Sequence, residues 1–423
     1  REEPVNASKQ ITALVVTEDP NKNADGSDPD TLTGPYHITA EAFPSDSGEV
    51  IVYPRKAGYQ RGDRVIVRAR AYPGSAFHHW EAALAGTEPL ASLTIYGDTT
   101  VRAVFESLVP RQLHVPQQYA TIQEAIDAAT YGDRVVVDFG TYSGEGNRDL
   151  DFHGRHMTLA GQSQEETIID LGGSEAEPHR LAELVDVEGT VYLEYMTVRN
   201  GYAGRSVFVG TPNRVGGAVI AGRKSSLYVA FCTFANCHAP YGGGAIYFDD
   251  PYPGSDAKLH VSNSRFEGCT TDEMGGAVKA RNPSRLASLD VWFSQCIFRN
   301  NSGFGGGAIY IPELYGNLQV SHSEFTGNRA NTDGGAMNVQ RVYNTAEITD
   351  CAFADNGASI AGGLYCEGDR AERGGRTFVR SCRFTGNTAS SYGGALSTGM
   401  VGYTSDPVIV ENCTFEGNSA RSG

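Results

Sequence analysis

The sequence predicts an all-β chain whose larger part, from about Leu113 to Gly423, is a right-handed parallel β-helix. Two observations predict this fold class. A short motif built on a phenylalanine, with a Gly-Gly pair farther on, recurs at a period near 30 residues, which indicates a solenoid or another repeat array. The Gly pairs and β-branched runs also exclude helical repeats, because each interior Gly costs a helix roughly 1 kcal/mol. The 51 glycines accordingly indicate many tight turns.

The repeat is anchored on a phenylalanine. The anchors are Phe234, Phe266, Phe298, Phe325, Phe353, Phe384 and Phe415, at intervals of 32, 32, 27, 28, 31 and 31 residues. Three residues after each anchor come Cys237, Cys269, Asn301, Asn328, Asn356, Asn387 and Asn418. About 30 residues fit one coil of three short strands, whereas a propeller blade needs roughly 40 to 45. We therefore expect stacked phenylalanines inside the coils and a ladder of asparagines, with neighbours about 4.8 Å apart.

Each anchor from Phe234 to Phe384 is followed by a Gly-Gly pair and then Ala or Leu. The pairs begin at Gly243, Gly275, Gly306, Gly334, Gly362 and Gly393, and an earlier pair begins at Gly216. Such a pair permits a turn that a Cβ atom would obstruct. This F-x-x-N and G-G-A/L pattern resembles the repeat of chlamydial polymorphic outer-membrane proteins and of many β-helical surface proteins. The resemblance covers about 310 residues and implies an architecture, not a chemistry.

Residues 1–108 are expected to form a small all-β domain. Residues 36–42 and 64–71 alternate apolar and polar side chains, as half-buried antiparallel strands do, and Pro and Gly separate them. Residues 36–105 resemble the divergent B-repeat modules of bacterial cell-surface proteins. That resemblance implies a spacer or stalk unit.

The second predicted domain, residues 109–423, begins with a capping helix at about 121–131. Thr121 and Glu124 form a capping box, and Gly132 is expected to end the helix. With the following strand at 134–138, this start resembles that of pectin-lyase-like β-helices, in which a helix covers the open end of the core. The need is physical, because an uncapped solenoid exposes its core and its strand edges.

The last coil is expected to be incomplete. After Asn418 the chain reaches Gly423 where the next Gly-Gly-Ala would stand. Either further residues follow, or a neighbouring molecule covers the open coil. Self-association through this coil is therefore one predicted partner interaction.

A calcium loop is the one cofactor site that the sequence suggests. Oxygen ligands stand at Asn21, Asn23 and Asp25, with Gly26 next, as in calcium-binding loops. Leu32, however, occupies the position at which a bidentate Glu would be needed. The alternative is an acidic, solvated loop, and no other metal or cofactor is expected.

The cysteines admit two interpretations. Five of them lie two residues before an anchor and are expected to be buried thiols: Cys232, Cys296, Cys351, Cys382 and Cys413. Cys237 and Cys269 instead occupy the ladder position of neighbouring coils, where Cα atoms about 5 Å apart lie within reach of a disulfide. A disulfide between coils and two free thiols both remain open.

The strand after each Gly-Gly-Ala supplies the candidate site. Its first residue is apolar and points inward, so the next residue should point outward. The expected outward stripe consists of Tyr247, Lys279, Tyr310 and Asn338, with Asp249, Arg281 and Gln340 two residues farther on. Polar and aromatic side chains in such a row are of the kind that binds sugars.

Two functions from different classes follow. In a polysaccharide lyase, Lys279 or Arg281 would be the base and Asp249 would assist charge neutralisation; a glycoside hydrolase is the less favoured enzyme. In the other interpretation the stripe is an ordinary solvated face. The chain is then a secreted or cell-surface structural or adhesive protein that presents a rigid scaffold to a polysaccharide, to a protein or to itself. The uniform repeat favours the scaffold, because an enzyme would interrupt several coils with long loops.

Charge and hydropathy restrict the partners. The net charge of −16 and the lack of a basic run exclude a nucleic-acid or anionic-membrane partner. No apolar segment approaches the roughly 18 residues of a transmembrane helix. An extracellular or cell-surface location is expected.

Overall fold

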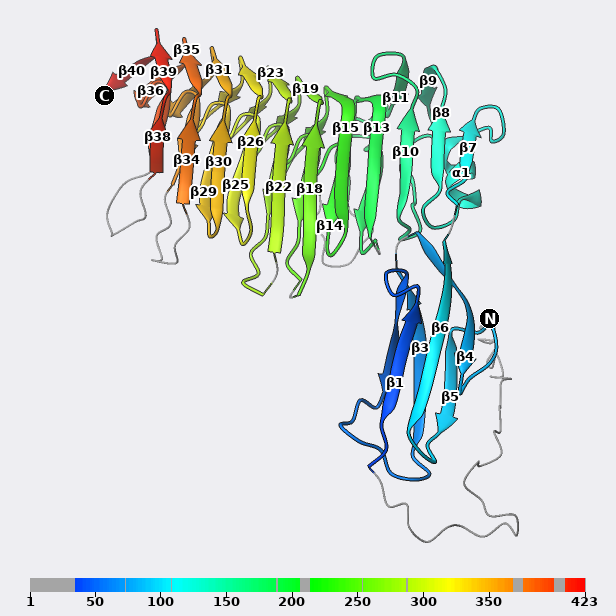
Figure 1. Ribbon diagram of the computed structural model, residues 1–423. Helices are drawn as coiled ribbons and strands as arrows, with labels where there is room; N and C mark the ends of the chain where they lie inside the picture. Colours follow the sequence, from blue (N-terminus) through cyan, green and yellow to red (C-terminus); the bar gives the residue numbers. More distant parts are fainter. Residues whose placement is uncertain are drawn as a thin grey trace, which may run out of the picture. The chain divides into compact units, whose positions relative to one another are not determined.

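The computed structural model describes residues 35–72, 74–107, 109–187, 189–205, 214–252, 254–286, 288–367, 376–398 and 408–422. The chain divides into two compact units, residues 1–110 and 111–423 (Figure 1). The calcium candidates Asn21, Asn23 and Asp25 lie outside the described residues.

The first unit contains two three-stranded sheets. Their strands are β1 (Ile38–Phe43), β6 (Thr99–Ser107) and β4 (Ser75–Ala82) in one sheet, and β2 (Gly48–Tyr53), β3 (Arg64–Ala71) and β5 (Leu90–Thr94) in the other. Strand β1 pairs with β6 in parallel, while the other pairs are antiparallel. Trp80 is 2% exposed in the core and donates a hydrogen bond from Nε1 to the Glu88 carbonyl oxygen at 2.9 Å.

The second unit begins with β7 (Gln112–Val115) and the capping helix α1 (Ile122–Ala128). Thr121 and Glu124 form the expected capping box, and Ile122, Ala125 and Ile126 are buried. The helix ends before the predicted residue 131. Its last carbonyl groups accept hydrogen bonds from the side chains of Arg111 and Arg155, because the final turn of a helix leaves such acceptors without intrahelical partners.

Parallel strands then stack coil upon coil in three sheets (Figure 1). The eight-stranded sheet contains β12 (Ala182–Val185), β14 (Val219–Gly222), β17 (Ile246–Asp249), β21 (Val278–Arg281), β25 (Ile309–Leu314), β29 (Met337–Val342), β33 (Leu364–Cys366) and β37 (Leu396–Thr398). The seven-stranded sheet contains β16 (His238–Ala239), β20 (Thr270–Thr271), β24 (Ser302–Gly303), β28 (Arg329–Ala330), β32 (Gly357–Ile360), β36 (Thr388–Tyr392) and β40 (Ser419–Ser422).

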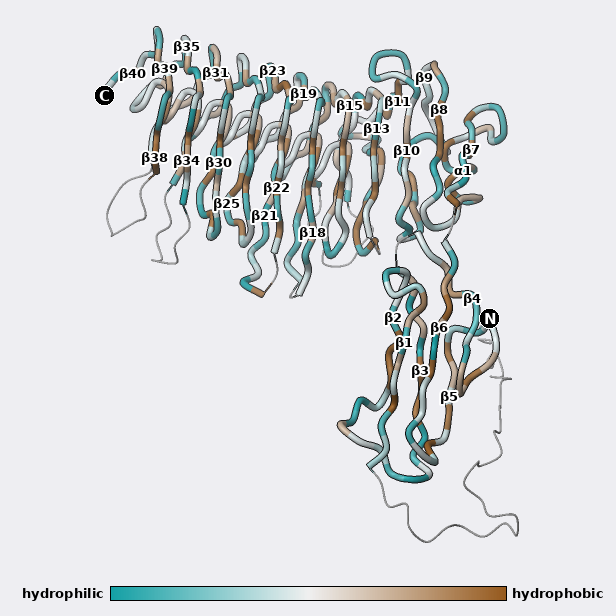
Figure 2. Tube along the Cα trace, in the orientation of Figure 1, coloured by the Kyte–Doolittle hydropathy of each residue, from teal (hydrophilic) through white to brown (hydrophobic). Residues whose placement is uncertain are grey.

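The 19-stranded sheet receives two strands from most coils, because the chain bends at a residue of positive φ such as Asn263. Besides β7 it contains β8 (Arg134–Val137), β9 (Gly140–Ser143), β10 (Met157–Gly161), β11 (Thr167–Asp170), β13 (Thr190–Arg199), β15 (Ser226–Ala235), β18 (Asp256–Ser262), β19 (Arg265–Glu267), β22 (Ser288–Ser294), β23 (Ile297–Arg299), β26 (Leu318–Ser321), β27 (Glu324–Thr326), β30 (Thr345–Thr349), β31 (Ala352–Ala354), β34 (Arg376–Arg380), β35 (Arg383–Thr385), β38 (Val408–Glu411) and β39 (Thr414–Glu416). Strands rich in valine and isoleucine, such as β8 and β38, are brown in Figure 2.

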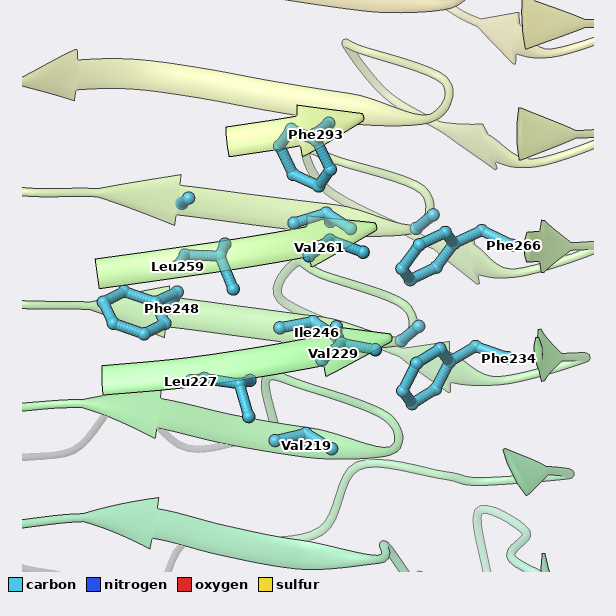
Figure 3. Close-up of a cluster of buried hydrophobic side chains, with 14 of the residues drawn as sticks. Val219, Leu227, Val229, Phe234, Ile246, Phe248, Leu259, Val261, Phe266 and Phe293 are labelled. Atoms are coloured by element: carbon cyan, nitrogen blue, oxygen red, sulfur yellow. The ribbon is translucent and has the colours of Figure 1, made fainter. Parts of the chain in front are cut away.

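Stacked phenylalanines fill the interior. The seven anchors from Phe234 to Phe415 lie with successive ring centres 4.7 to 5.2 Å apart and nearly parallel planes. Figure 3 shows Phe234 and Phe266 in equivalent places on neighbouring coils, with Leu227 and Leu259 stacked in the same way. Identical side chains from successive coils therefore build one continuous dry core.

The asparagine ladder runs beside this stack. Asn328 Nδ2 donates to Asn356 Oδ1 at 2.9 Å, and the same contact links each neighbouring pair from Asn301 to Asn418 at 2.8 to 3.0 Å. Each amide also donates to the carbonyl oxygen of a phenylalanine anchor at 2.8 to 3.0 Å. The fold class predicted from sequence, an all-β parallel β-helix with a capping helix and a small N-terminal all-β region, is confirmed.

The cysteines are free thiols in the structure. Of the two alternatives for Cys237 and Cys269, the structure has the two free thiols. Both side chains are fully buried, and each thiol donates a hydrogen bond to a backbone carbonyl, of Ala235 and Phe234 respectively, at 3.5 Å. Burial raises the pKa of the Cys269 thiol well above its usual range, so this thiol is held in its protonated form.

Candidate functional site

The predicted stripe lies on the eight-stranded sheet in the expected order. Strands β17, β21, β25 and β29 are successive neighbours, and their parallel register aligns Tyr247 with Lys279, Lys279 with Tyr310, and Tyr310 with Asn338. The same register aligns Asp249 with Arg281. We call these six residues the polar stripe; Gln340 lies beside its last coils.

The expected exposure is wrong for four of the six residues of the polar stripe, while Lys279 and Arg281 are half-buried. Tyr247 is 2% exposed, Asn338 1%, Asp249 7% and Tyr310 9%. Tyr247 packs with Val185, Val215 and Ile220, an apolar cluster on the neighbouring coils. The side chains alternate away from the core as period 2 requires, but this apolar cluster covers Tyr247.

Lys279 is held between two aromatic rings. Its Nζ atom lies 5.8 Å from the centre of the Tyr247 ring and 5.7 Å from that of Tyr310, within the range of a cation–π contact. The aliphatic part of the side chain passes Gly242, where an added Cβ would lie 2.7 Å from Lys279 Cδ. Burial lowers the pKa of the Lys279 amine, with the nearby Arg281 charge acting in the same direction.

Asp249 and Arg281 form an ion pair across adjacent coils. Arg281 Nη2 donates to Asp249 Oδ2 at 2.8 Å, and the Tyr247 hydroxyl donates to the same oxygen at 3.3 Å. Burial opposes the charge on Arg281, but the hydrogen bond with Asp249 and the electrostatic interactions with Tyr247 and Asp249 together outweigh burial and raise the pKa of the guanidinium. Burial also raises the pKa of Tyr247, so its hydroxyl stays protonated. Asp249 and Arg281 are therefore paired with each other through Oδ2 and Nη2.

The far end of the polar stripe is less fully bonded. The Tyr310 hydroxyl donates to Gln340 Oε1 at 3.4 Å. Among the described residues, neither amide atom of Asn338 has a hydrogen-bond partner, and Asp249 Oδ1 lacks one too. Unpaired buried polar atoms are the usual places for ordered water.

A cavity of about 300 Å³ lies on the first coils. Its lining includes Asp149, Asp151, Arg180, Glu183 and Arg205. The guanidinium of Arg180, 5% exposed, binds Glu183 and donates from Nη2 to the Gly204 carbonyl oxygen at 2.9 Å. Burial lowers the pKa of Arg180, and the Glu183 charge opposes that effect.

Glu183 also heads the column of the polar stripe, since it aligns with Ile220 and Ile220 aligns with Tyr247. Sequence reasoning missed it because no Gly-Gly-Ala precedes it.

A second row of side chains on the 19-stranded sheet was also missed. Tyr192, Tyr228, His260 and Trp292 are half-buried and follow one another in register on β13, β15, β18 and β22. A cavity of about 290 Å³ lies beside His260 and Trp292. The signal was present in the sequence, because each of the last three aromatic residues stands six positions before a phenylalanine anchor.

The described residues contain no group of three or more His, Cys, Asp or Glu side chains arranged to hold a metal ion. The described part of the chain likewise holds no helix with the length and apolar character that a membrane crossing needs.

Comparison with known proteins gives a short sequence match and several distant structural ones. Residues 381–399 match the family described as Chlamydia polymorphic membrane protein (Chlamydia_PMP) repeat. No curated protein sequence matches the chain.

Three solved structures show the extent of the structural likeness. ORF18 of Geobacillus virus E2 is 14% identical, with 74% of this chain and 60% of that chain covered and a TM-score of 0.30. The pectin methylesterase of Aspergillus niger is 16% identical over 73% of this chain and 86% of its own, with a TM-score of 0.30. The family 28 exopolygalacturonase of Yersinia enterocolitica is 10% identical, with 88% of this chain and 98% of that chain covered and a TM-score of 0.26.

Proposed function

We propose that this chain is a secreted or cell-surface scaffold that binds a partner on the outside of its coils and does not cleave polysaccharide. One observation carries the proposal. The charged groups that a lyase would need already have partners in the chain, because Lys279 lies between two tyrosine rings and Arg281 is bound to the buried Asp249. A catalytic base must come within hydrogen-bond reach of the proton that it removes.

The regular repeat supports a scaffold. Each coil contacts its neighbours through the same phenylalanine stack and asparagine ladder, so the outer faces form a long, rigid surface. The likeness of residues 381–399 to a membrane-protein repeat supports a surface location. The partner is a polysaccharide, a protein or a second copy of the chain.

A polysaccharide lyase is the second candidate, and one feature favours it. Burial lowers the pKa of Lys279, which makes its amine a better base near neutral pH than an exposed lysine. Lys279 is half-buried between the two rings, so for this amine to act it would have to leave both rings and reach the substrate.

Turnover separates the two candidates. The purified chain is incubated with a panel of uronate polysaccharides while the absorbance of unsaturated products is followed, and a characterised lyase serves as the positive control. The scaffold proposal predicts no product with the wild type. Product formation that is lost in both Lys279→Ala and Arg281→Ala but kept in the matched surface variant Lys258→Ala would establish the lyase and overturn the proposal.

A further inference from the structure

An aromatic row runs along the outside of the 19-stranded sheet. Tyr192, Tyr228, His260 and Trp292 have successive ring centres 5.2, 5.1 and 5.6 Å apart. The residues that follow them, Leu193, Val229, Val261 and Phe293, are buried, so the aromatic side chains point away from the core. On the earlier coils the row continues through His156 to Tyr131, with ring centres 5.8 and 5.0 Å apart.

A row of small side chains lies next to the aromatic row. Ala230, Ser262 and Ser294 stand two positions after Tyr228, His260 and Trp292, and Ser321, two positions after Gln319, continues the row in register. Beyond Ala230, the exposed rings of Tyr195 and Phe231 stack 4.9 Å apart where the strands bend. Large rings beside short hydroxyl side chains leave a hollow, and the cavity of about 290 Å³ includes Trp292, Ser294, Gln319 and Ser321. We call this row and its hollow the aromatic groove.

We propose that the aromatic groove binds a neutral polysaccharide laid along the axis of the β-helix. Sugar rings would pack on Tyr228, His260 and Trp292, and sugar hydroxyls would bind Ser294, Ser321 and Gln319. A sugar ring offers a C–H face and a rim of hydroxyls, which is the same combination of apolar and polar surface that the groove offers. This inference rests on the proposed scaffold function and adds its site and ligand class.

Charge favours a neutral chain as the occupant. The carboxylate of Glu194 is paired with Arg134 at 2.7 Å, and Asp290 Oδ1 accepts two hydrogen bonds from Asn317 at 2.9 Å. Lys258 aligns directly with Asp290, so the two opposite charges stand side by side. With a net charge of −16 overall, the chain would repel a polyanion such as a polyuronate.

The backbone disfavours an extended peptide as the occupant. Peptides commonly bind a sheet by adding a strand to a free edge. Strands β15, β18 and β22 each have a paired strand on both sides, so the groove lies on a face whose main-chain groups are already bonded. Recognition there must use side chains, as stacking on sugars does.

The two tryptophans give a direct test. Trp80 is buried in the first unit, while Trp292 is half-buried in the aromatic groove, so Trp80→Phe leaves one reporter. This variant is titrated with hydroxyethylcellulose, galactomannan and amylose. We expect a saturable change of tryptophan fluorescence with at least one glycan. Tyr228→Ala should weaken the affinity roughly fivefold or more, because it removes about one aromatic contact. Tyr241→Ala, which removes an exposed ring elsewhere on the chain, should leave the affinity unchanged.

Affinity gel electrophoresis of the wild type and Trp292→Ala in the same three glycans covers the case in which Trp80→Phe fails to fold. The wild type should be retarded and Trp292→Ala should not. No saturable response to any of the three glycans, or an equal response in Tyr228→Ala, would overturn the inference. Turnover of uronates tests the proposed function separately. If the chain neither binds the glycans nor turns over uronates, the aromatic groove is refuted as a glycan site, but the proposed scaffold function stands.

Discussion

Arg281 Nη2 donates a 2.8 Å hydrogen bond to Asp249 Oδ2, and this contact joins two coils whose residues are 32 positions apart in sequence. The Asp249 side chain is 10% exposed and that of Arg281 37%. Arg281→Ala would leave the buried carboxylate without its main partner. We expect a loss of about 1.5 to 3 kcal/mol in the free energy of unfolding, measured by urea titration.

The control for that prediction is Arg383→Ala. Arg383 forms a comparable pair between coils with Glu416 at 3.2 Å, but both side chains are about two-thirds exposed, and exposed pairs contribute little. Equal destabilisation by the two variants would contradict a special role for the buried pair.

The asparagine ladder should be a main source of stability. Asn356 accepts from the Asn328 amide at Oδ1 and donates from Nδ2 to Asn387 and to the Phe325 carbonyl. Asn356→Ala leaves several of these buried groups without partners, at roughly 1 to 3 kcal/mol for each group. The urea midpoint should fall sharply, whereas Asn317→Ala, at an exposed position, should change it little; a small effect of Asn356→Ala would show that water replaces the ladder.

The second glycine of each Gly-Gly pair should be essential. A Cβ atom on Gly307 would lie 2.1 Å from the Gly335 carbonyl oxygen, and backbone atoms cannot give way as a flexible side chain can. Gly307→Ala should therefore prevent cooperative folding, as judged by circular dichroism and thermal melting. Gly417 has positive φ, and a Cβ atom added there meets nothing within 4 Å, so Gly417→Ala should cost only about 1 kcal/mol. Similar melting of the two variants would contradict the packing argument.

Stability should fall as the pH falls below about 6.5, the ordinary pKa of histidine. Burial lowers the pKa of His156, and its Nδ1 accepts a hydrogen bond from the Thr190 amide at 3.1 Å. At this residue the unfolded chain therefore binds a proton more readily than the folded chain. The contribution of neutral His156 to the free energy of unfolding is present in full above pH 6.5 and is lost as the pH falls from there through the lowered pKa of the folded chain. Thermal melting from pH 7.5 to 5.0 should show a smaller decline in His156→Gln than in the wild type, and an unchanged decline would exclude this residue as the cause.

The sequence was sufficient for most of the architecture. Phe298 and Asn328 recur at the period of one coil, and a repeated position must stack on itself, so the stack and the ladder followed directly. The capping box at Thr121 located α1, but its end at Ala128 depends on the side chain of Arg155, which comes from a coil farther along the chain.

The candidate site was harder to predict for a physical reason. Alternation along β17 indicates that Tyr247 points away from the core, but it does not reveal that Val215 and Ile220 cover it. Covering contacts come from other coils and leave no local pattern. Trp292 and His260 did carry a pattern, six residues before each anchor, yet only the register of β18 and β22 joins them into a row.

The proposal that the polar stripe is a structural element and not an active site is tested most directly by the reactivity of Lys279. The folded chain is treated with an amine-acetylating reagent, and each lysine is quantified over time by mass spectrometry. The unprotonated amine is the form that reacts, so the lowered pKa alone would make Lys279 react faster than the exposed Lys224. Slower acetylation of Lys279 than of Lys224 would therefore report its burial. We predict that the half-buried Lys279 reacts several times more slowly than the exposed Lys224 in the folded chain and equally fast in the denatured chain. Acetylation of Lys279 in the folded chain as fast as that of Lys224 would contradict the proposal.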